Sequence, residues 1–151
     1  GTGMFGDDLE KKTAILERVL EKHKKAKEPL DALAAFGGLE VATLTGAVIQ
    51  AASERRVIVV DGFIASSAVL VASRLRPKVL DYCIFSHRSD EQGHSLMLDE
   101  MNAEPLFDLK LRLGEGSGAA LAWPLLMSAC TILREMASFE AAGVSRDDES
   151  K

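Results

Sequence analysis

The chain has 151 residues, of which 47% are hydrophobic and 27% charged, and it carries a net charge of −5 at pH 7. This length and composition suit one globular domain with a hydrophobic core and exclude a disordered tail. The acidic balance argues against a nucleic-acid partner. The most apolar run, Ala119 to Met127, is too short for the roughly 18 residues of a membrane span, so no membrane partner is expected.

The compartment is inferred from the N-terminus and the cysteines. The first residues are polar at once, unlike a signal peptide. Cys83 and Cys130 both lie in apolar runs and lack the spacing of metal ligands. We therefore expect two buried free thiols in a reducing, cytoplasmic environment. The basic cluster from Lys22 to Lys27 is expected at a solvated helix end, where cations complement the helix dipole.

Helices and strands alternate along the predicted chain. Apolar spacing and stop signals predict helices over residues 8–25, 29–35, 39–54, 64–75, 90–101 and 117–137, with strands over 57–62, 82–85 and 105–112. This alternation favours an α/β fold, a Rossmann-like layered domain with a parallel sheet and flanking helices. Residues 1–140 are predicted to form a single domain, with 141–151 as a frayed tail. The few strands suggest a fragment of a larger α/β enzyme.

Candidate ligand-binding residues follow three of the predicted extended segments. They are Asp61-Gly62, Ser86-His87 and the glycine-flanked Glu115. Because ligands of parallel sheets bind at the carboxyl ends of the strands, one sheet edge can gather all three. Asp61 either caps the next helix or faces that crevice, and its position alone leaves both open.

The run Gly114 to Gly118 places one carboxylate, Glu115, among three glycines that permit close approach to a ligand. Ser117 can cap the following helix and leave backbone N–H groups aimed at an anion. Close to Leu113 and Trp123, Glu115 should have a raised pKa and could act as a general base. The alternative is a tight structural turn whose glutamate points to water.

Two polar clusters remain. The spacing of His87, Glu91 and His94 could present three metal ligands, but Gly93 makes one continuous helix doubtful, so no metal site is predicted. The hydroxyls of Ser86 and Ser89 are better suited to a phosphate or a ribose, with a plain capped loop as the alternative.

The N-terminal stretch from Gly1 to Gly3 carries the other cluster. It could cradle a phosphate neutralised by Lys12, or it could be a flexible terminus with a solvated lysine.

Taken together and in this order, the motifs resemble a known family. They are GTG…DD, GGLE, VDGFIASSA, SHRSDEQGH, EPLFDLKLRLGEGSGAALAWPLL and EMASFEAAGV. The chain resembles the C-terminal part of the nicotinate-nucleotide:dimethylbenzimidazole phosphoribosyltransferases over nearly all of its length. These enzymes transfer phosphoribose from nicotinate mononucleotide to 5,6-dimethylbenzimidazole in cobalamin nucleotide-loop assembly, giving α-ribazole 5′-phosphate and nicotinate.

The resemblance also implies residue roles. Glu115 matches the family's catalytic base, which takes the benzimidazole proton, and Asp61 matches an acidic residue lining the active site. Lys12, Gly1 and Ser89 match positions around the phosphate. Leu113 and Gly114 would lie against the aromatic base. The chemistry needs no metal or cofactor, and the family is usually homodimeric.

Family members are about twice as long as this chain. The missing N-terminal half supplies much of the benzimidazole pocket and another active-site glutamate, so the resemblance implies that the isolated chain is inactive. The competing hypothesis is a non-catalytic α/β module that binds a nucleotide or base, or that only builds an oligomer interface. A truncated domain that exposes Ala119 to Met127 is also expected to self-associate.

Overall fold

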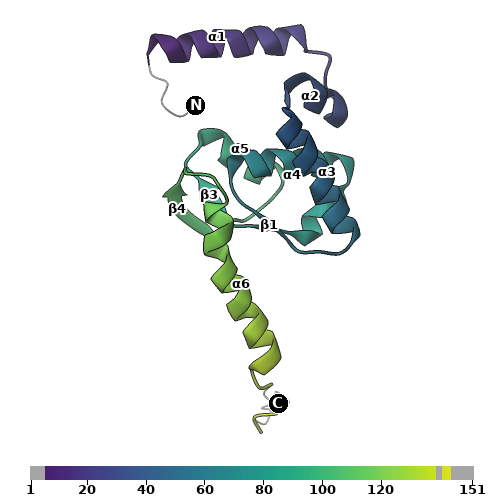
Figure 1. Cartoon of the computed structure of the whole chain (residues 1–151), viewed down its shortest axis with the longest axis vertical. Helices are drawn as coiled ribbons and strands as arrows, with labels where there is room; N and C mark the ends of the chain where they lie inside the picture. The colour runs from purple at the N-terminus through teal and green to yellow at the C-terminus, as the bar shows by residue number, and fades with distance from the viewer. Residues whose placement is uncertain (1–5, 139–140, 144–151) are drawn as a thin grey trace, which may run out of the picture.

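The computed structural model describes residues 6–138 and 141–143 of the chain. Helices outnumber strands, and the two alternate through the second half of the sequence (Figure 1). In chain order the elements are α1 (Asp7–Lys22), α2 (Pro29–Phe36), α3 (Leu39–Ser53), β1 (Ile58–Val60), α4 (Phe63–Leu75), the 3₁₀ helix η1 (Pro77–Tyr82), β2 (Cys83–Phe85), β3 (His87–Ser89), α5 (Gln92–Glu100), β4 (Phe107–Leu111) and α6 (Ser117–Glu135).

All strand pairing in the described residues is parallel. β1 pairs with β2, and β3 pairs with β4 through an irregular register. β2 and β3 follow each other with only Ser86 between them, and Ser86 bonds to both sides: its N–H donates to Val60, and its carbonyl accepts from Phe107. The two sheets are therefore joined at Ser86, and the carboxyl ends of β1, β3 and β4 lead into the same cavity.

The hydrophobic core lies between α3, α4, η1, α5 and the β1–β2 pair. Its buried members are Val48, Ala52, Val60, Val69, Ala72, Val79, Phe85, Leu98 and Met101. Small side chains at the α3–α4 contact allow these helices to pack closely. The hydroxyl of Thr45 donates to the carbonyl of Val41 at 2.8 Å and lies 3.3 Å from the carbonyl oxygen of Ala68 across the contact. This core fixes the strand ends from which the site is built.

The α/β architecture with parallel strands is as predicted, and most element bounds agree within three residues. Two elements were missed. β3 was missed because His87–Ser89 is polar and has no apolar alternation, so only its pairing with β4 makes it a strand. η1 was missed because Pro77 ends one helix and starts a short 3₁₀ turn, which periodicity does not detect.

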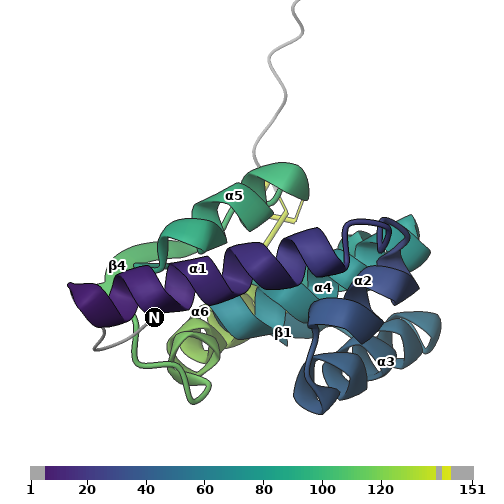
Figure 2. The same ribbon diagram turned by 90° about the horizontal axis from the view of Figure 1, so that it is seen from above.

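α1 and α6 extend away from this body at opposite ends (Figure 1). From above, α1 lies across the molecule as a straight helix (Figure 2), and none of its residues is buried. In α6 only Gly118 and Ala122 are buried. By length and composition alone α6 could cross a membrane, but its first turn is built into the α/β body, as described below.

The prediction of two buried cysteines is half wrong. Cys130 is exposed, because it lies on the projecting part of α6. Cys83 is partly buried at the start of β2, and desolvation raises the pKa of its thiol to about 11. The basic cluster begins in the last turn of α1, which ends at Lys22 and therefore three residues earlier than predicted.

Candidate active site

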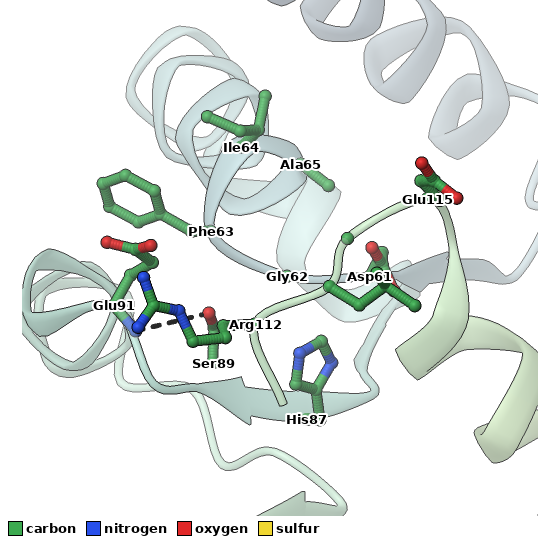
Figure 3. A pocket seen from close by; sticks show the side chains of 12 residues that line it. Asp61, Gly62, Phe63, Ile64, Ala65, His87, Ser89, Glu91, Arg112 and Glu115 are labelled. Carbon is green, nitrogen blue, oxygen red and sulfur yellow. Dashed lines mark hydrogen bonds between the residues drawn. The ribbon is translucent and has the colours of Figure 1, made fainter. Parts of the chain in front are cut away.

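A cavity of about 370 Å³ opens where β1, β3 and β4 end. Its wall combines residues from three separate stretches of the chain (Figure 3). They are Asp61, Gly62, Phe63, Ile64, Ala65, His87, Ser89, Glu91, Arg112, Leu113, Gly114 and Glu115. The prediction that one edge gathers the three strand-end motifs is confirmed.

The carboxylate of Asp61 holds the N-terminus of α6. One oxygen, Oδ1, accepts the backbone N–H groups of Gly118 at 2.8 Å and Ala119 at 3.1 Å, and Oδ2 accepts that of Gly116 at 3.3 Å. An acidic group at this point satisfies N–H groups that the helix cannot pair, and it also complements the positive end of the helix dipole. Asp61 thus caps a helix that starts more than fifty residues later, rather than the next helix.

This arrangement corrects the expectation for Ser117. Ser117 is the first residue of α6 and not its cap, and its buried hydroxyl oxygen has no hydrogen-bond partner among the described residues. The N–H groups expected to face an anion are occupied by Asp61. An anionic ligand therefore needs another donor, and the uncapped N-terminus of α4, where Phe63, Ile64 and Ala65 line the cavity, provides one.

Glu115 sits in a turn with an unusual backbone. Gly114, Glu115 and Gly116 have φ angles of +78°, +57° and +78°. Glycine adopts this left-handed region freely, whereas for a residue with a Cβ it costs on the order of 1–2 kcal/mol. Strain of this kind persists where the surrounding structure enforces it and is frequent at functional sites.

The apolar environment predicted for Glu115 is absent from the described part of the chain. Glu115 is exposed at the cavity rim. The side chains of Leu113 and Trp123 are also exposed, at 73% and 60%. The turn therefore offers the carboxylate to the cavity mouth rather than burying it.

Two histidines lie side by side below the cavity, with ring centroids 6.3 Å apart. His94 is fully buried, and both of its nitrogens are used: Ser89 N–H donates to Nδ1 at 2.8 Å, and Nε2 bonds to the hydroxyl of Ser66 at 2.9 Å. Desolvation, together with His87 and Arg88, lowers the pKa of His94 to about 4. His94 is thus a neutral structural residue with no lone pair for a metal. The described residues contain no metal-binding cluster of His, Cys, Asp or Glu.

Only some of the other site residues predicted from the sequence line the cavity. Ser89, Leu113 and Gly114 line the cavity together with Glu115 and Asp61. Lys12 lies on α1 and is not part of the cavity wall. Gly1 falls outside the described residues.

Sequence reasoning assigned no ligand-binding role to Arg112 or the first turn of α4, although both line the cavity. His87 was predicted to lie at the strand ends with Asp61 and Glu115, but the only specific role considered for it was that of a metal ligand. Arg112 was overlooked because a single arginine after a strand is common on surfaces. Its place two residues before the Gly114–Gly118 run was the available signal.

Comparison with known proteins agrees with this geometry. A profile described as a phosphoribosyltransferase matches residues 1–144. The chain belongs to this phosphoribosyltransferase family. A nicotinate-nucleotide–dimethylbenzimidazole phosphoribosyltransferase of Variovorax paradoxus is 66% identical over 148 residues, which are 98% of this chain and 42% of the relative. The enzyme of the same description from Cupriavidus necator is 57% identical, over 96% of this chain and 42% of its own length.

A solved family structure shares the fold. The crystal structure of CobT from Thermus thermophilus superimposes with a TM-score of 0.87 at 37% identity, covering 97% of this chain and 44% of that one. The chain thus spans about two fifths of the length of the family members it matches.

Proposed function

We propose that this chain provides the catalytic base and the nucleotide-binding part of an enzyme that makes α-ribazole 5′-phosphate in cobalamin nucleotide-loop assembly. The substrates are nicotinate mononucleotide and 5,6-dimethylbenzimidazole, and nicotinate is released. The observation that carries the proposal is Glu115, held in a left-handed turn at the cavity rim by the α6 N-terminus that Asp61 fixes.

In the proposed reaction, a nitrogen of the benzimidazole attacks the anomeric carbon of the ribose. The bond from that carbon to the nicotinate nitrogen breaks, and nicotinate leaves with the electron pair. The second benzimidazole nitrogen loses its proton to the carboxylate of Glu115. The negative charge of Glu115 also favours the cation-like ribosyl centre that forms as nicotinate departs. Asp61 contributes by holding the turn in place, with Leu113 and Gly114 beside the aromatic base.

The phosphate fits at the opposite end of the cavity. There the first turn of α4 has no side-chain cap, and the hydroxyl of Ser89 and the guanidinium of Arg112 lie nearby in the cavity wall (Figure 3). Backbone N–H groups of a helix N-terminus and an arginine are the usual partners of a phosphate. Roles for Gly1 and for Lys12 of α1 at the same phosphate remain part of the proposal.

The whole enzyme needs more than this chain. Relatives are more than twice as long, and Glu115 is exposed here, so we propose that further protein completes the benzimidazole pocket and that the isolated chain does not turn over. We also propose a homodimer, supported by the exposed apolar residues of α6, and a cytoplasmic location.

A chimera tests the function. This chain replaces the matching 148 residues of the Variovorax paradoxus relative, and α-ribazole 5′-phosphate is measured by chromatography. The unaltered chimera should form product, and Glu115→Gln should lower turnover by a factor of about 100 or more with little change in nucleotide affinity. Glu104→Gln, at an exposed glutamate outside the cavity, serves as the matched control and should keep full activity.

Two results would contradict the proposal. A chimera that binds nicotinate mononucleotide without turnover points to a non-catalytic binding module. An active chimera in which Glu115→Gln is as fast as the control leaves the reaction in place but removes Glu115 as its base.

A further inference from the structure

His87 forms the floor of the cavity and has no role in the mechanism above. It is only 2% exposed, and its ring fits between two glycines from different elements. A Cβ at Gly118 would lie 1.9 Å from His87 Nδ1, and a Cβ at Gly62 would lie 3.0 Å from Cε1 and 3.3 Å from Nε2. A side chain at position 118 would overlap the imidazole and one at position 62 would press against it, so the two glycines hold the ring in place.

The neighbouring hydroxyl determines which nitrogen of the ring carries the proton. Ser86 Oγ donates its only hydrogen to the carbonyl oxygen of Asp61 at 2.7 Å. The contact of 3.2 Å between Ser86 Oγ and His87 Nδ1 therefore requires Nδ1–H as the donor. In the neutral ring, Nε2 is left with a free lone pair at the cavity.

His94 has the opposite tautomer. Its Nδ1 accepts the N–H of Ser89, so Nε2 carries the proton and donates to Ser66. Both of its nitrogens are paired within the protein, whereas Nε2 of His87 makes no hydrogen bond to any of the described residues. Two adjacent histidines are thus distinguished: one is structural, and the other offers an acceptor to whatever fills the cavity.

We propose that His87 Nε2 accepts a hydrogen bond from a ribose hydroxyl of the nucleotide, an inference that rests on the proposed function. The phosphate and the carboxylate of nicotinate mononucleotide are acceptors, so only its ribose hydroxyls can donate to Nε2. The position also fits. Figure 3 shows the His87 ring between Ser89, at the proposed phosphate end, and Asp61, near the Glu115 turn. The ribose is likewise the part of the nucleotide between phosphate and base.

The tautomer is tested on the full chain by NMR. Long-range ¹H–¹⁵N spectra, assigned with His87→Asn, should show a proton on Nδ1 of His87 and none on Nε2, with the reverse pattern for His94 as an internal reference. Nicotinate mononucleotide should then shift the Nε2 signal toward lower frequency in the chimera. A proton on Nε2 of His87 in the neutral ring, or an Nε2 signal unmoved at saturating nucleotide, overturns the inference.

Kinetics with two variants of the chimera separate substrate binding from a structural role. Asn reproduces the donor at the Nδ1 position toward Ser86 but reaches nothing at Nε2, whereas Gln places its amide oxygen near Nε2 and gives up the contact to Ser86. We expect His87→Asn to lower kcat/KM for nicotinate mononucleotide by about tenfold or more, and His87→Gln to lose less. If Asn is the better replacement, His87 only supports Ser86 and the inference is wrong.

Deoxy analogues identify the donor. Removing one ribose hydroxyl should cost the unaltered chimera about tenfold in kcat/KM and should cost His87→Asn nothing further, because the partner is already gone. If removal of either the 2′ or the 3′ hydroxyl lowers kcat/KM as much in His87→Asn as in the unaltered chimera, the proposed hydrogen bond is contradicted. A chimera that neither binds the nucleotide nor turns over overturns the proposed function itself. An active chimera with the wrong order of variants overturns only the role of His87.

Discussion

The two ends of α6 have opposite surroundings. At the N-terminal end, Asp61 binds three backbone N–H groups, Gly118 packs against the His87 ring, and Ala122 is buried. Beyond Ala122, apolar side chains face solvent, among them Trp123 at 60% and Leu133 at 86% exposure. One helix therefore combines a tightly specified end with an apolar surface that the described residues leave open.

The difference between the two ends shows which part of α6 is fixed by contacts within this chain. The polar groups at the first turn of α6 are satisfied within the chain, apart from the Ser117 hydroxyl, so the Glu115 turn is fixed here. The exposed apolar side chains of α6 beyond Ala122 are Trp123, Leu125, Met127, Ile132 and Leu133. We expect such a group to make a contact with further protein. Substitutions at the two ends should accordingly have very different effects.

Removing the Asp61 carboxylate should have the largest effect. Asp61→Ala leaves three N–H groups unpaired at a helix end. The two shorter bonds, from Gly118 and Ala119, are charge-assisted and worth about 1.5–3 kcal/mol each, so we expect unfolding to become easier by about 4 kcal/mol. Asp61→Asn should lose about half of that, because one oxygen remains. Urea denaturation of the full chain measures both.

Asp108→Asn is the control for this prediction, since Asp108 is exposed and its ion-pair partner is Lys110. Equal, small changes in unfolding free energy for the Asp61 and Asp108 variants would show that Asp61 does not hold α6.

The contact between Asp61 and α6 also marks the limit of sequence reasoning. The carboxyl-end rule placed Asp61, His87 and Glu115 at one edge, because that rule depends only on the strand–helix order. It could not show that Asp61 caps α6, since the two are joined by a long-range contact that leaves no periodic signal.

The burial of Glu115 and Cys130 was mispredicted for a related reason. Apolar neighbours in sequence indicate burial only when the surface that covers them belongs to the same chain. The elements themselves were mostly predictable, because helix periods, Pro77 and the paired glycines are local signals.

A methyl group at Gly118 should have the next largest effect. The added Cβ would overlap His87 Nδ1, so the ring must move, and we expect Gly118→Ala to destabilise the fold by about 3 kcal/mol. Gly46→Ala in α3 is the matched control, because nothing lies within 4 Å of its added Cβ. That variant should instead gain up to about 1 kcal/mol from helix propensity. Thermal unfolding followed by circular dichroism measures both variants. Equal shifts of the unfolding temperature for Gly118→Ala and Gly46→Ala would contradict the prediction.

Acid should lower the stability of the fold through His94 of α5, which lies beside His87. The folded state lowers the pKa of His94 to about 4 from an ordinary value of 6.5, so between these values the unfolded chain binds more protons. The contribution of His94 to the free energy of unfolding is therefore fully present above pH 6.5. It falls by on the order of 2 kcal/mol as the pH approaches 4.

Urea denaturation at pH 7.5 and at pH 5 gives the slope of the unfolding free energy against pH. His94→Gln should flatten it, whereas His23→Gln, at a partly exposed histidine, should not. A slope that survives in His94→Gln must come from other groups.

In the Glu115 turn, unlike at Asp61 and Gly118, a substitution should raise the stability of the fold. Glu115→Gly relieves the left-handed strain, and we expect the fold to gain about 1 kcal/mol while the chimera loses turnover. Glu115→Gln keeps the Cβ and should leave stability unchanged, which separates strain from charge. A Gly variant no more stable than the Gln variant would mean that the turn is not strained.

The open end of α6 should be the least sensitive to substitution within one chain. Leu125 and Leu133 are 48% and 86% exposed, so replacing both by lysine should change the unfolding free energy by less than about 0.5 kcal/mol. The same change should abolish the self-association that we expect from this surface, measured by sedimentation velocity across a concentration series. Ala122→Leu, at a fully buried position of the same helix, should destabilise the fold instead. If the unaltered chain sediments as a monomer at every concentration, the apolar face of α6 is not a contact between copies of this chain, and the self-association prediction is wrong.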